Sequence, residues 1–133
     1  MRVCGIIAEY DPFHQGHAWQ IAQVKHQLGA KYIVCVISCG FSQRGTPAMF
    51  STHARAKMAL DGGADLVLGM PYAYGTAQAN RFAMGGVGIL HQLKVVTHLC
   101  FGVEEKAFPL LHRAKDHGLK DNPLVAQKRK GFL

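Results

Sequence analysis

Short apolar runs alternate with segments of helical period along most of the chain, and this alternation limits the possible folds more than any other feature. The runs are rich in β-branched residues and span Val3 to Ala8, Tyr32 to Ile37, Asp65 to Leu68 and Val95 to Phe101. Strands that are apolar throughout and alternate with helices are typical of a parallel sheet covered on both faces. We therefore predict an α/β fold with a Rossmann-like parallel sheet and helices on both faces.

Three segments between these runs carry helix signals. The first places Ala18, Ile21, Ala22 and Leu28 on one face and ends at Gly29. The second has Ser51 as its N-cap and runs through Leu60 to Gly62 and Gly63, with Arg55 and Lys57 expected on its exposed side. The third is expected to bury a long apolar stripe made of Ala79, Phe82, Ala83, Gly86, Val87, Leu90 and Leu93.

The chain has 133 residues, enough for one domain with its own core. The helix and strand pattern weakens toward the end, so we place the α/β domain, the candidate nucleotide-binding domain, at residues 1–118. Residues 119–133 are predicted to form a basic tail, a candidate for disorder. The formal net charge of +7 favours polyanionic partners, either nucleotide phosphates or RNA.

No apolar stretch is long enough for a membrane span, and the apolar run after Arg2 is too short for a signal peptide. The four cysteines form no Cys-x-x-Cys pair, and three of them lie in apolar runs. We therefore expect a cytoplasmic protein with no membrane contact and no disulfide bond.

The first predicted strand leads into Glu9-Tyr10-Asp11-Pro12-Phe13-His14-Gln15-Gly16-His17, after which a helix begins. A helix N-terminus presents unpaired N–H groups and a partial positive charge, so it attracts phosphate. His14 and His17 are expected to stabilise charge that develops during attack at an α-phosphorus, and Gly16 to allow a nucleotide close to the backbone. Two other roles remain open: capping of the helix alone, or a metal pair. No further metal ligand lies at short spacing, so we assign no metal site.

Ligand crevices in parallel α/β sheets lie at the carboxyl ends of the strands. The loop after the second run, Ser38 to Pro47, is long enough to suggest a function. In it, Ser38, Gln43 and Arg44 are candidates for contact with a substrate or RNA, although Arg44 is almost as well explained as a solvated side chain. Gly102 follows the fourth run, where it is either a crevice residue or a turn glycine.

These segments together resemble bacterial tRNA(Met) cytidine acetate ligases. The resemblance is carried, in order, by Glu9 to His17, Ser38 to Pro47, Arg55 to Leu60, Gly63 to Val67 and Phe101-Gly102. It covers about residues 1 to 105 and implies a Rossmann-like fold of the HUP or HIGH nucleotidyltransferase type.

The resemblance implies an enzyme that activates acetate with ATP to acetyl-adenylate and then acetylates N4 of the wobble cytidine of elongator tRNA(Met). It makes His14 and His17 the catalytic residues and implies that Mg²⁺ accompanies ATP. The implied ATP contacts are Ile7, Ala8, Glu9, Tyr10, Pro12, Phe13, His14, Gly16, His17, Gln20 and Gly102. Because the family continues for hundreds of residues, we expect a truncated member, a free-standing divergent paralogue, or a chain that works as a homodimer or with a partner chain.

Two other functions remain open on the sequence. One is an adenylyl- or cytidylyltransferase that acts on a small metabolite with the same histidine motif. The other is a non-catalytic module that binds a nucleotide or RNA without turnover.

Overall fold

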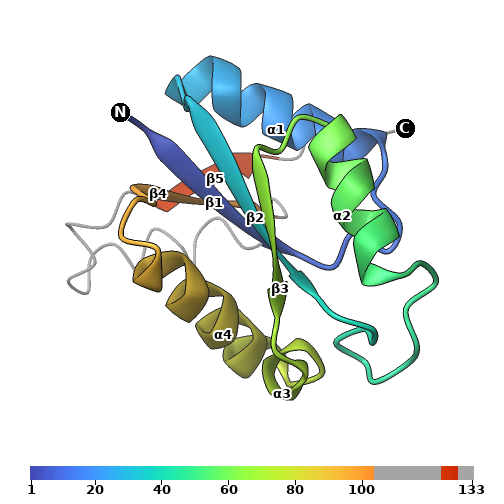
Figure 1. Ribbon diagram of the computed structural model, residues 1–133. Coiled ribbons are helices and arrows are strands. Elements are labelled where there is room, and N and C mark those ends of the chain that lie inside the picture. Colours follow the sequence, from blue (N-terminus) through green and yellow to red (C-terminus); the bar gives the residue numbers. More distant parts are fainter. Residues whose placement is uncertain (104–123, 129–133) are drawn as a thin grey trace.

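The predicted parallel sheet is present, and it has one strand more than the sequence indicated (Figure 1). The structure is a computed structural model that describes residues 1–103 and 124–128. The strands are β1 (Val3–Ala8), β2 (Tyr32–Ser38), β3 (Leu66–Met70), β4 (His98–Val103) and β5 (Leu124–Lys128), in the spatial order β3-β2-β1-β4-β5. All neighbouring strands are parallel. The chain builds outward from β1 to β3 and then returns to β4 on the other side, so the strand order reverses between β1 and β4.

The strand positions confirm the sequence reading for β1, β2 and β3 to within two residues. β4 begins later than predicted, at His98 rather than Val95. Lys94 has a left-handed backbone with φ 59°, and Val95 is exposed. The chain first bonds to β1 at Thr97, whose N–H donates to the Val3 carbonyl over 2.9 Å.

The structure has a fifth strand within the basic tail predicted at residues 119–133. Residues 124–128 pair in parallel with β4, with Leu99 opposite Leu124 and Val103 opposite Lys128. A β-strand needs only an exposed edge to pair with, and the sequence does not reveal that β4 presents one. The remaining residues of the predicted tail lie outside the described ranges.

The helices are α1 (Gln15–Leu28), α2 (Thr52–Asp61), α3 (Tyr72–Gly75) and α4 (Ala79–Gln92). The predicted boundaries of the first two are confirmed. Gly29 caps α1 in the left-handed conformation with φ 58°, and the Ser51 hydroxyl accepts from the Ala54 N–H at the start of α2. No helix in the described part of the chain is long and apolar enough to cross a membrane.

Helices cover both faces of the sheet, as predicted (Figure 1). α1 and α2 pack on one face over Cys4, Ile6, Ile33, Cys35 and Ile37. α4 packs on the other face over Val3, Val34 and Val36. Successive strand residues therefore alternate between two cores, which explains why the strands are apolar throughout.

The buried face of α4 differs from the predicted stripe. Phe82, Gly86, Leu90 and Leu93 do face the sheet or are partly buried, but Ala79, Ala83 and Val87 are exposed. Gly85 and Ile89 lie inward instead. The helix approaches the sheet along its glycines: a Cβ on Gly86 would lie 2.6 Å from Ile7 Cδ1. This close approach sets the rotation of the helix, and an apolar periodicity count cannot detect it.

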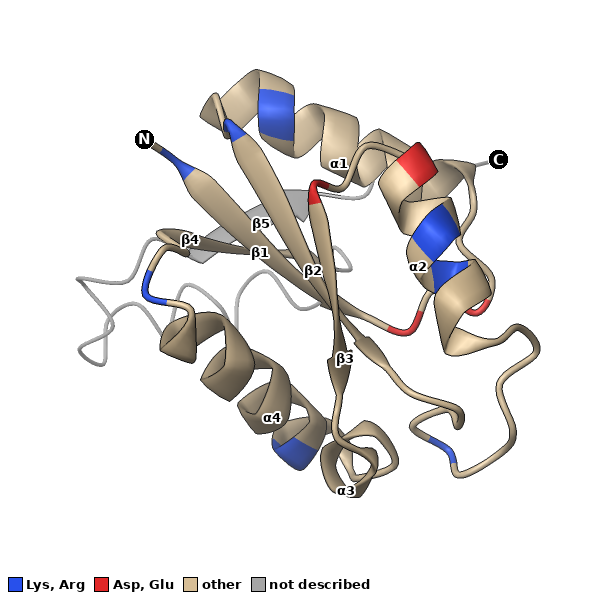
Figure 2. Ribbon diagram, in the orientation of Figure 1, with Lys and Arg blue, Asp and Glu red and all other residues tan. Residues whose placement is uncertain are grey.

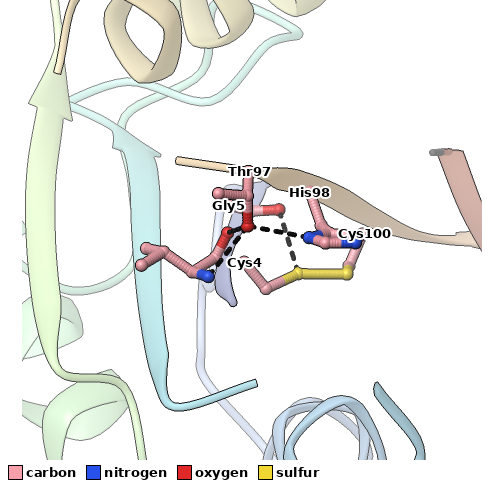
Figure 3. The surroundings of a disulfide bond; sticks show 6 residues. Cys4, Gly5, Thr97, His98 and Cys100 are labelled. Carbon is pink, nitrogen blue, oxygen red and sulfur yellow. Dashed lines mark hydrogen bonds between the residues drawn. A yellow bond between two sulfur atoms is a disulfide. The ribbon is translucent and has the colours of Figure 1, made fainter. Parts of the chain in front are cut away.

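The structure also contradicts the expectation of no disulfide. Cys4 and Cys100 are bonded, with Cα atoms 6.4 Å apart, in the core between β1 and α1 (Figure 3). Cys4 lies opposite His98 in the strand register, so Cys100 is two residues further along on the same face. The two cysteines are 96 residues apart in the chain, and only the pairing of β1 with β4 brings them together.

Candidate functional site

A crevice of about 510 Å³ lies where the strand order reverses, at the carboxyl ends of β1 and β4. Its volume is in the range of small-molecule sites. Nine of the predicted ATP contacts line it: Ile7, Ala8, Glu9, Tyr10, Pro12, His14, His17, Gln20 and Gly102. Phe13 and Gly16 do not line it, whereas Ile6, Asp11, Gln43 and Phe101 do.

His14 and His17 begin α1 and cap it reciprocally. His14 Nδ1 accepts from the Gly16 N–H over 3.1 Å, and His17 Nδ1 accepts from the His14 N–H over 3.2 Å. The two rings stack with centroids 3.7 Å apart. A neutral imidazole that accepts at Nδ1 carries its hydrogen on Nε2, so these two crevice-lining residues would each offer an Nε2–H donor.

Gly16 contributes through His14. A Cβ at this position would lie 2.9 Å from His14 Cε1 and 3.1 Å from Nδ1, closer than such contacts normally come. A side chain at residue 16 would therefore displace the His14 ring that caps the helix.

Behind the histidines lies an aromatic cluster. Tyr10 packs against His17 with ring centroids 4.7 Å apart and against Phe13 at 4.8 Å, and Phe13 lies 5.5 Å from His17. Phe13 in turn contacts the end of α2 so closely that a Cβ on Gly62 would overlap its ring. Phe13 thus supports the crevice wall from behind without lining it.

Tyr10 is buried although it leaves the end of β1 with a left-handed backbone, φ 53°. That conformation costs a non-glycine residue roughly 1 kcal/mol. Its hydroxyl lies 3.6 Å from the sulfur of Cys35 in the core. Burial and then the neighbouring thiol raise the pKa of Tyr10 far above its usual range. Burial likewise raises the pKa of the Cys35 thiol to about 11. Tyr10 is therefore a neutral support for the site.

Two carboxylates tie the segment before α1 to the β2–α2 loop, residues 39–51. The Glu9 carboxylate accepts from the Gln43 N–H. The Asp11 carboxylate accepts from the N–H groups of Met49 and Phe50 over 2.8 and 3.0 Å. These bonds bring the loop to the crevice, where Gln43 forms part of the lining.

Arg55 corrects the prediction that it is exposed: its side chain is fully buried, whereas Lys57 is exposed as expected. Arg55 Nη1 donates to the Glu9 carbonyl over 2.6 Å, and Nε donates to the Phe50 carbonyl over 3.1 Å. The sequence reading placed charged residues on the outside of the helix and missed this one. The one sequence feature that could have singled out Arg55 was its place in the segment Arg55 to Leu60, on which the family resemblance rests.

The three loop residues predicted to contact a substrate or RNA lie in different environments. Gln43 lines the crevice, and Arg44 is exposed on the loop beside it. Ser38 is buried at the end of β2, 1% exposed, below the loop. Lys and Arg positions lie on α1 and α2 on one side of the sheet and on α4 on the other (Figure 2). The positive charges of the described residues therefore do not gather on one surface that would indicate where a polyanion binds.

Within residues 1–103 and 124–128, no group of three or more His, Cys, Asp and Glu side chains is placed to hold a metal ion. The crevice carboxylates Glu9 and Asp11 are already engaged by backbone N–H groups.

A crevice at the strand-order reversal of a parallel α/β sheet, beside a helix N-terminus, is the arrangement of Rossmann-like ligand-binding proteins. The family model described as HIGH Nucleotidyl Transferase matches residues 1–132. The chain belongs to that family.

Among curated relatives, a tRNA(Met) cytidine acetate ligase from Acetivibrio thermocellus is 47% identical over 104 residues, which are 78% of this chain and 25% of the relative. One from Clostridium perfringens (strain ATCC 13124) is 38% identical over 133 residues, which are 100% of this chain and 33% of the relative. The chain therefore spans a quarter to a third of the length of these relatives, and matches their N-terminal part.

Among solved structures, Thermotoga maritima TmcAL bound with alpha-thio ATP matches with a TM-score of 0.80 and 38% identity, covering 87% of this chain and 28% of that chain. The lipopolysaccharide core biosynthesis protein from Thermoplasma volcanium matches at 14% identity with a TM-score of 0.58, over 100% of this chain and 99% of that one. The second likeness shows the fold alone.

Proposed function

We propose that the chain binds ATP in the crevice and carries the adenylate-forming half of a tRNA(Met) cytidine acetate ligase. The observation that carries this proposal is the His14–His17 pair. Both rings are fixed at Nδ1 by backbone N–H groups at the start of α1 and line the crevice. The similarity to TmcAL, a protein solved with alpha-thio ATP, supports the nucleotide.

In this proposal the phosphates lie against the N-terminus of α1. Its first turn contains no acidic residue, so the positive end of the helix is not offset there. The Nε2–H groups of His14 and His17 donate to phosphate oxygens and stabilise the charge that develops at the α-phosphate. Ile7, Ala8, Gln20 and Gly102 also line the crevice and would contact the nucleoside.

The proposed reaction is attack of an acetate oxygen on the α-phosphorus. That P–O bond forms as the bond from the α-phosphorus to the bridging oxygen of the β-phosphate breaks, so acetyl-adenylate and pyrophosphate result. The acetyl group then passes to N4 of the wobble cytidine of elongator tRNA(Met), and AMP leaves. The histidines serve the first step alone.

Mg²⁺ would arrive with ATP. Because Glu9 and Asp11 are engaged by backbone groups, the described residues provide no ready protein cage, and the ion would be held by phosphate oxygens and water.

For the acceptor side, Gln43 and Arg44 would contact acetate or the tRNA from the β2–α2 loop. Ser38, buried below that loop, would act through the position of the loop rather than through contact with the ligand. The curated relatives are about three times as long as this chain. In this proposal tRNA docking uses surface beyond these 133 residues, such as that of a second copy or a partner chain.

The test is MgATP binding by calorimetry, followed by ATP–pyrophosphate exchange with and without acetate. Saturable binding and acetate-dependent exchange are expected. Exchange that needs another acceptor would identify an enzyme acting on a small metabolite, and binding without exchange would identify a non-catalytic module. Absence of MgATP binding would refute the proposed nucleotide site.

A further inference from the structure

The buried guanidinium of Arg55 is the least expected charge in the described structure. It is fully buried, no carboxylate pairs with it among the described residues, and its Nη2 has no hydrogen-bond partner there. A buried charge without an opposite charge is costly, and such breaches of the usual rules concentrate at functional sites. Its two hydrogen bonds show what the charge holds in place.

Those two bonds join segments that are far apart in the chain. Arg55 Nη1 donates to the Glu9 carbonyl at the end of β1, and Nε donates to the Phe50 carbonyl in the β2–α2 loop. The carboxylates of Glu9 and Asp11 bind the same loop from the other side, at Gln43, Met49 and Phe50. The segment before α1 and the β2–α2 loop are thus fixed relative to each other through the first turns of α2.

The Glu9 carbonyl belongs to the peptide group that precedes Tyr10. Fixing the plane of this peptide fixes one side of the Tyr10 φ rotation, and that φ is the strained value of 53°. The Tyr10 ring in turn packs 4.7 Å from the His17 ring. A continuous path of contacts therefore leads from Arg55 through the Glu9 peptide and Tyr10 to His17.

We propose that Arg55 is a positioning residue of the crevice: it holds the Glu9–Tyr10 peptide and the β2–α2 loop in the arrangement that orients His17 and brings Gln43 to the ligand. It does not line the crevice, so it acts through these neighbours. The predicted effect of Arg55 on nucleotide binding rests on the proposed function. Its predicted effect on the segment before α1 and on the β2–α2 loop does not.

The test compares Arg55→Met, which removes both donors and keeps an apolar stem, with Arg55→Lys, which keeps one charge without the planar fork. The control is Lys57→Met, two residues further along α2, where an exposed lysine loses its ion pair with Asp61. In Arg55→Met, amide hydrogen exchange should rise about tenfold at Gln43, Met49 and Phe50 while the core amides of β2 stay protected.

Two further readouts connect the loops to the site. Long-range ¹H–¹⁵N spectra report the His17 tautomer, and Arg55→Met should lose the single form protonated at Nε2. Affinity for MgATP should fall about tenfold in Arg55→Met, with partial recovery in Arg55→Lys. Lys57→Met should match the wild-type chain in all three measurements.

The inference is overturned if exchange rises equally in β2, if the His17 tautomer is unchanged, or if Arg55→Met binds MgATP as tightly as the wild-type chain. Should Arg55→Met not fold, Arg55→Lys decides the inference, because it keeps the charge but loses the planar set of donors. Unchanged amide exchange at Met49 and Phe50 in that variant would contradict the role of Arg55. A wild-type chain that binds no MgATP would refute the proposed function, whereas the exchange and tautomer measurements would still decide the role of Arg55.

Discussion

At the residue scale, the site depends on the orientation of two imidazoles rather than on their mere presence. Nδ1 of each ring is used by a backbone N–H group, and this selects the tautomer with hydrogen on Nε2. The sequence reading weighed helix capping against phosphate binding as alternatives. The structure shows that capping takes place through one nitrogen of each ring and thereby orients the other.

A substitution can separate the roles of the two ring nitrogens of His17. In His17→Asn, the amide oxygen can still accept from the His14 N–H, but the Nε2–H donor is lost. Affinity for MgATP should fall about tenfold or more, since a hydrogen bond to a charged group is worth about 1.5–3 kcal/mol. The free energy of unfolding should fall by about 1–2 kcal/mol, because the contacts of the His17 ring with Tyr10, Phe13 and His14 are lost although the cap is kept.

Calorimetry and urea unfolding check this prediction. The control is His26→Asn in the exposed last turn of the same helix, which should affect neither quantity. Unchanged affinity in His17→Asn would remove the phosphate role from this residue.

The buried Cys35 thiol gives the protein a dependence of stability on alkaline pH. Its pKa rises from an ordinary 9.0 to about 11 in the folded state because burial disfavours the thiolate. The unfolded state therefore loses this proton first as the pH rises. The resulting contribution is fully present below pH 9 and is lost between pH 9 and about 11.

Urea unfolding across this range should show a loss on the order of 2 kcal/mol that Cys35→Ala removes. Tyr10 acts in the same direction, since its pKa is also raised by burial. If wild-type and Cys35→Ala chains lose stability in parallel, Cys35 is not the source.

At the scale of elements, α4 shows that apolar periodicity predicts the position of a helix in the chain but not which face it buries. Helical spacing located the helix, but the helix lies on the sheet through glycines rather than through all of its large apolar residues. A methyl group on Gly86 would overlap the Ile7 side chain. A methyl group on Gly88 would meet no atom of the described residues within 4 Å. The choice of buried face follows from backbone approach, which depends on β1 as much as on α4.

Two alanine substitutions in α4 test this packing. Gly86→Ala should lower the free energy of unfolding by about 1–3 kcal/mol, because its methyl group would overlap Ile7. Gly88→Ala should raise it by up to about 1 kcal/mol, since alanine favours the helix and meets no neighbour among the described residues. Chemical denaturation gives both values, and equal effects at the two positions would contradict the assigned face of α4.

At the scale of the whole molecule, the pairing of β1 with β4 creates both the crevice and the disulfide. Thr97 reinforces the pairing beside that bond: its hydroxyl lies within hydrogen-bond distance of both the N–H and the carbonyl of Val3 (Figure 3). A crosslink that closes a loop spanning 96 residues restricts the unfolded chain strongly.

Thiol titration in denaturant should therefore find two reactive thiols, Cys35 and Cys39, out of the four cysteines before reduction and all four after it. Reduction, or Cys4→Ala with Cys100→Ala, should lower the free energy of unfolding by about 2–4 kcal/mol. Four reactive thiols without reductant would contradict the bond.

The sequence by itself determined the α/β class, the first three strands, the caps of α1 and α2 and most of the crevice lining. These features are local, because strand periodicity, a capping serine, a left-handed glycine and a histidine motif all act within a few residues. Tertiary structure alone decided the addition of β5, the rotation of α4, the Cys4–Cys100 bond and the burial of Arg55. Each depends on which distant segments become neighbours, and the spacing of residues along the chain does not encode that adjacency.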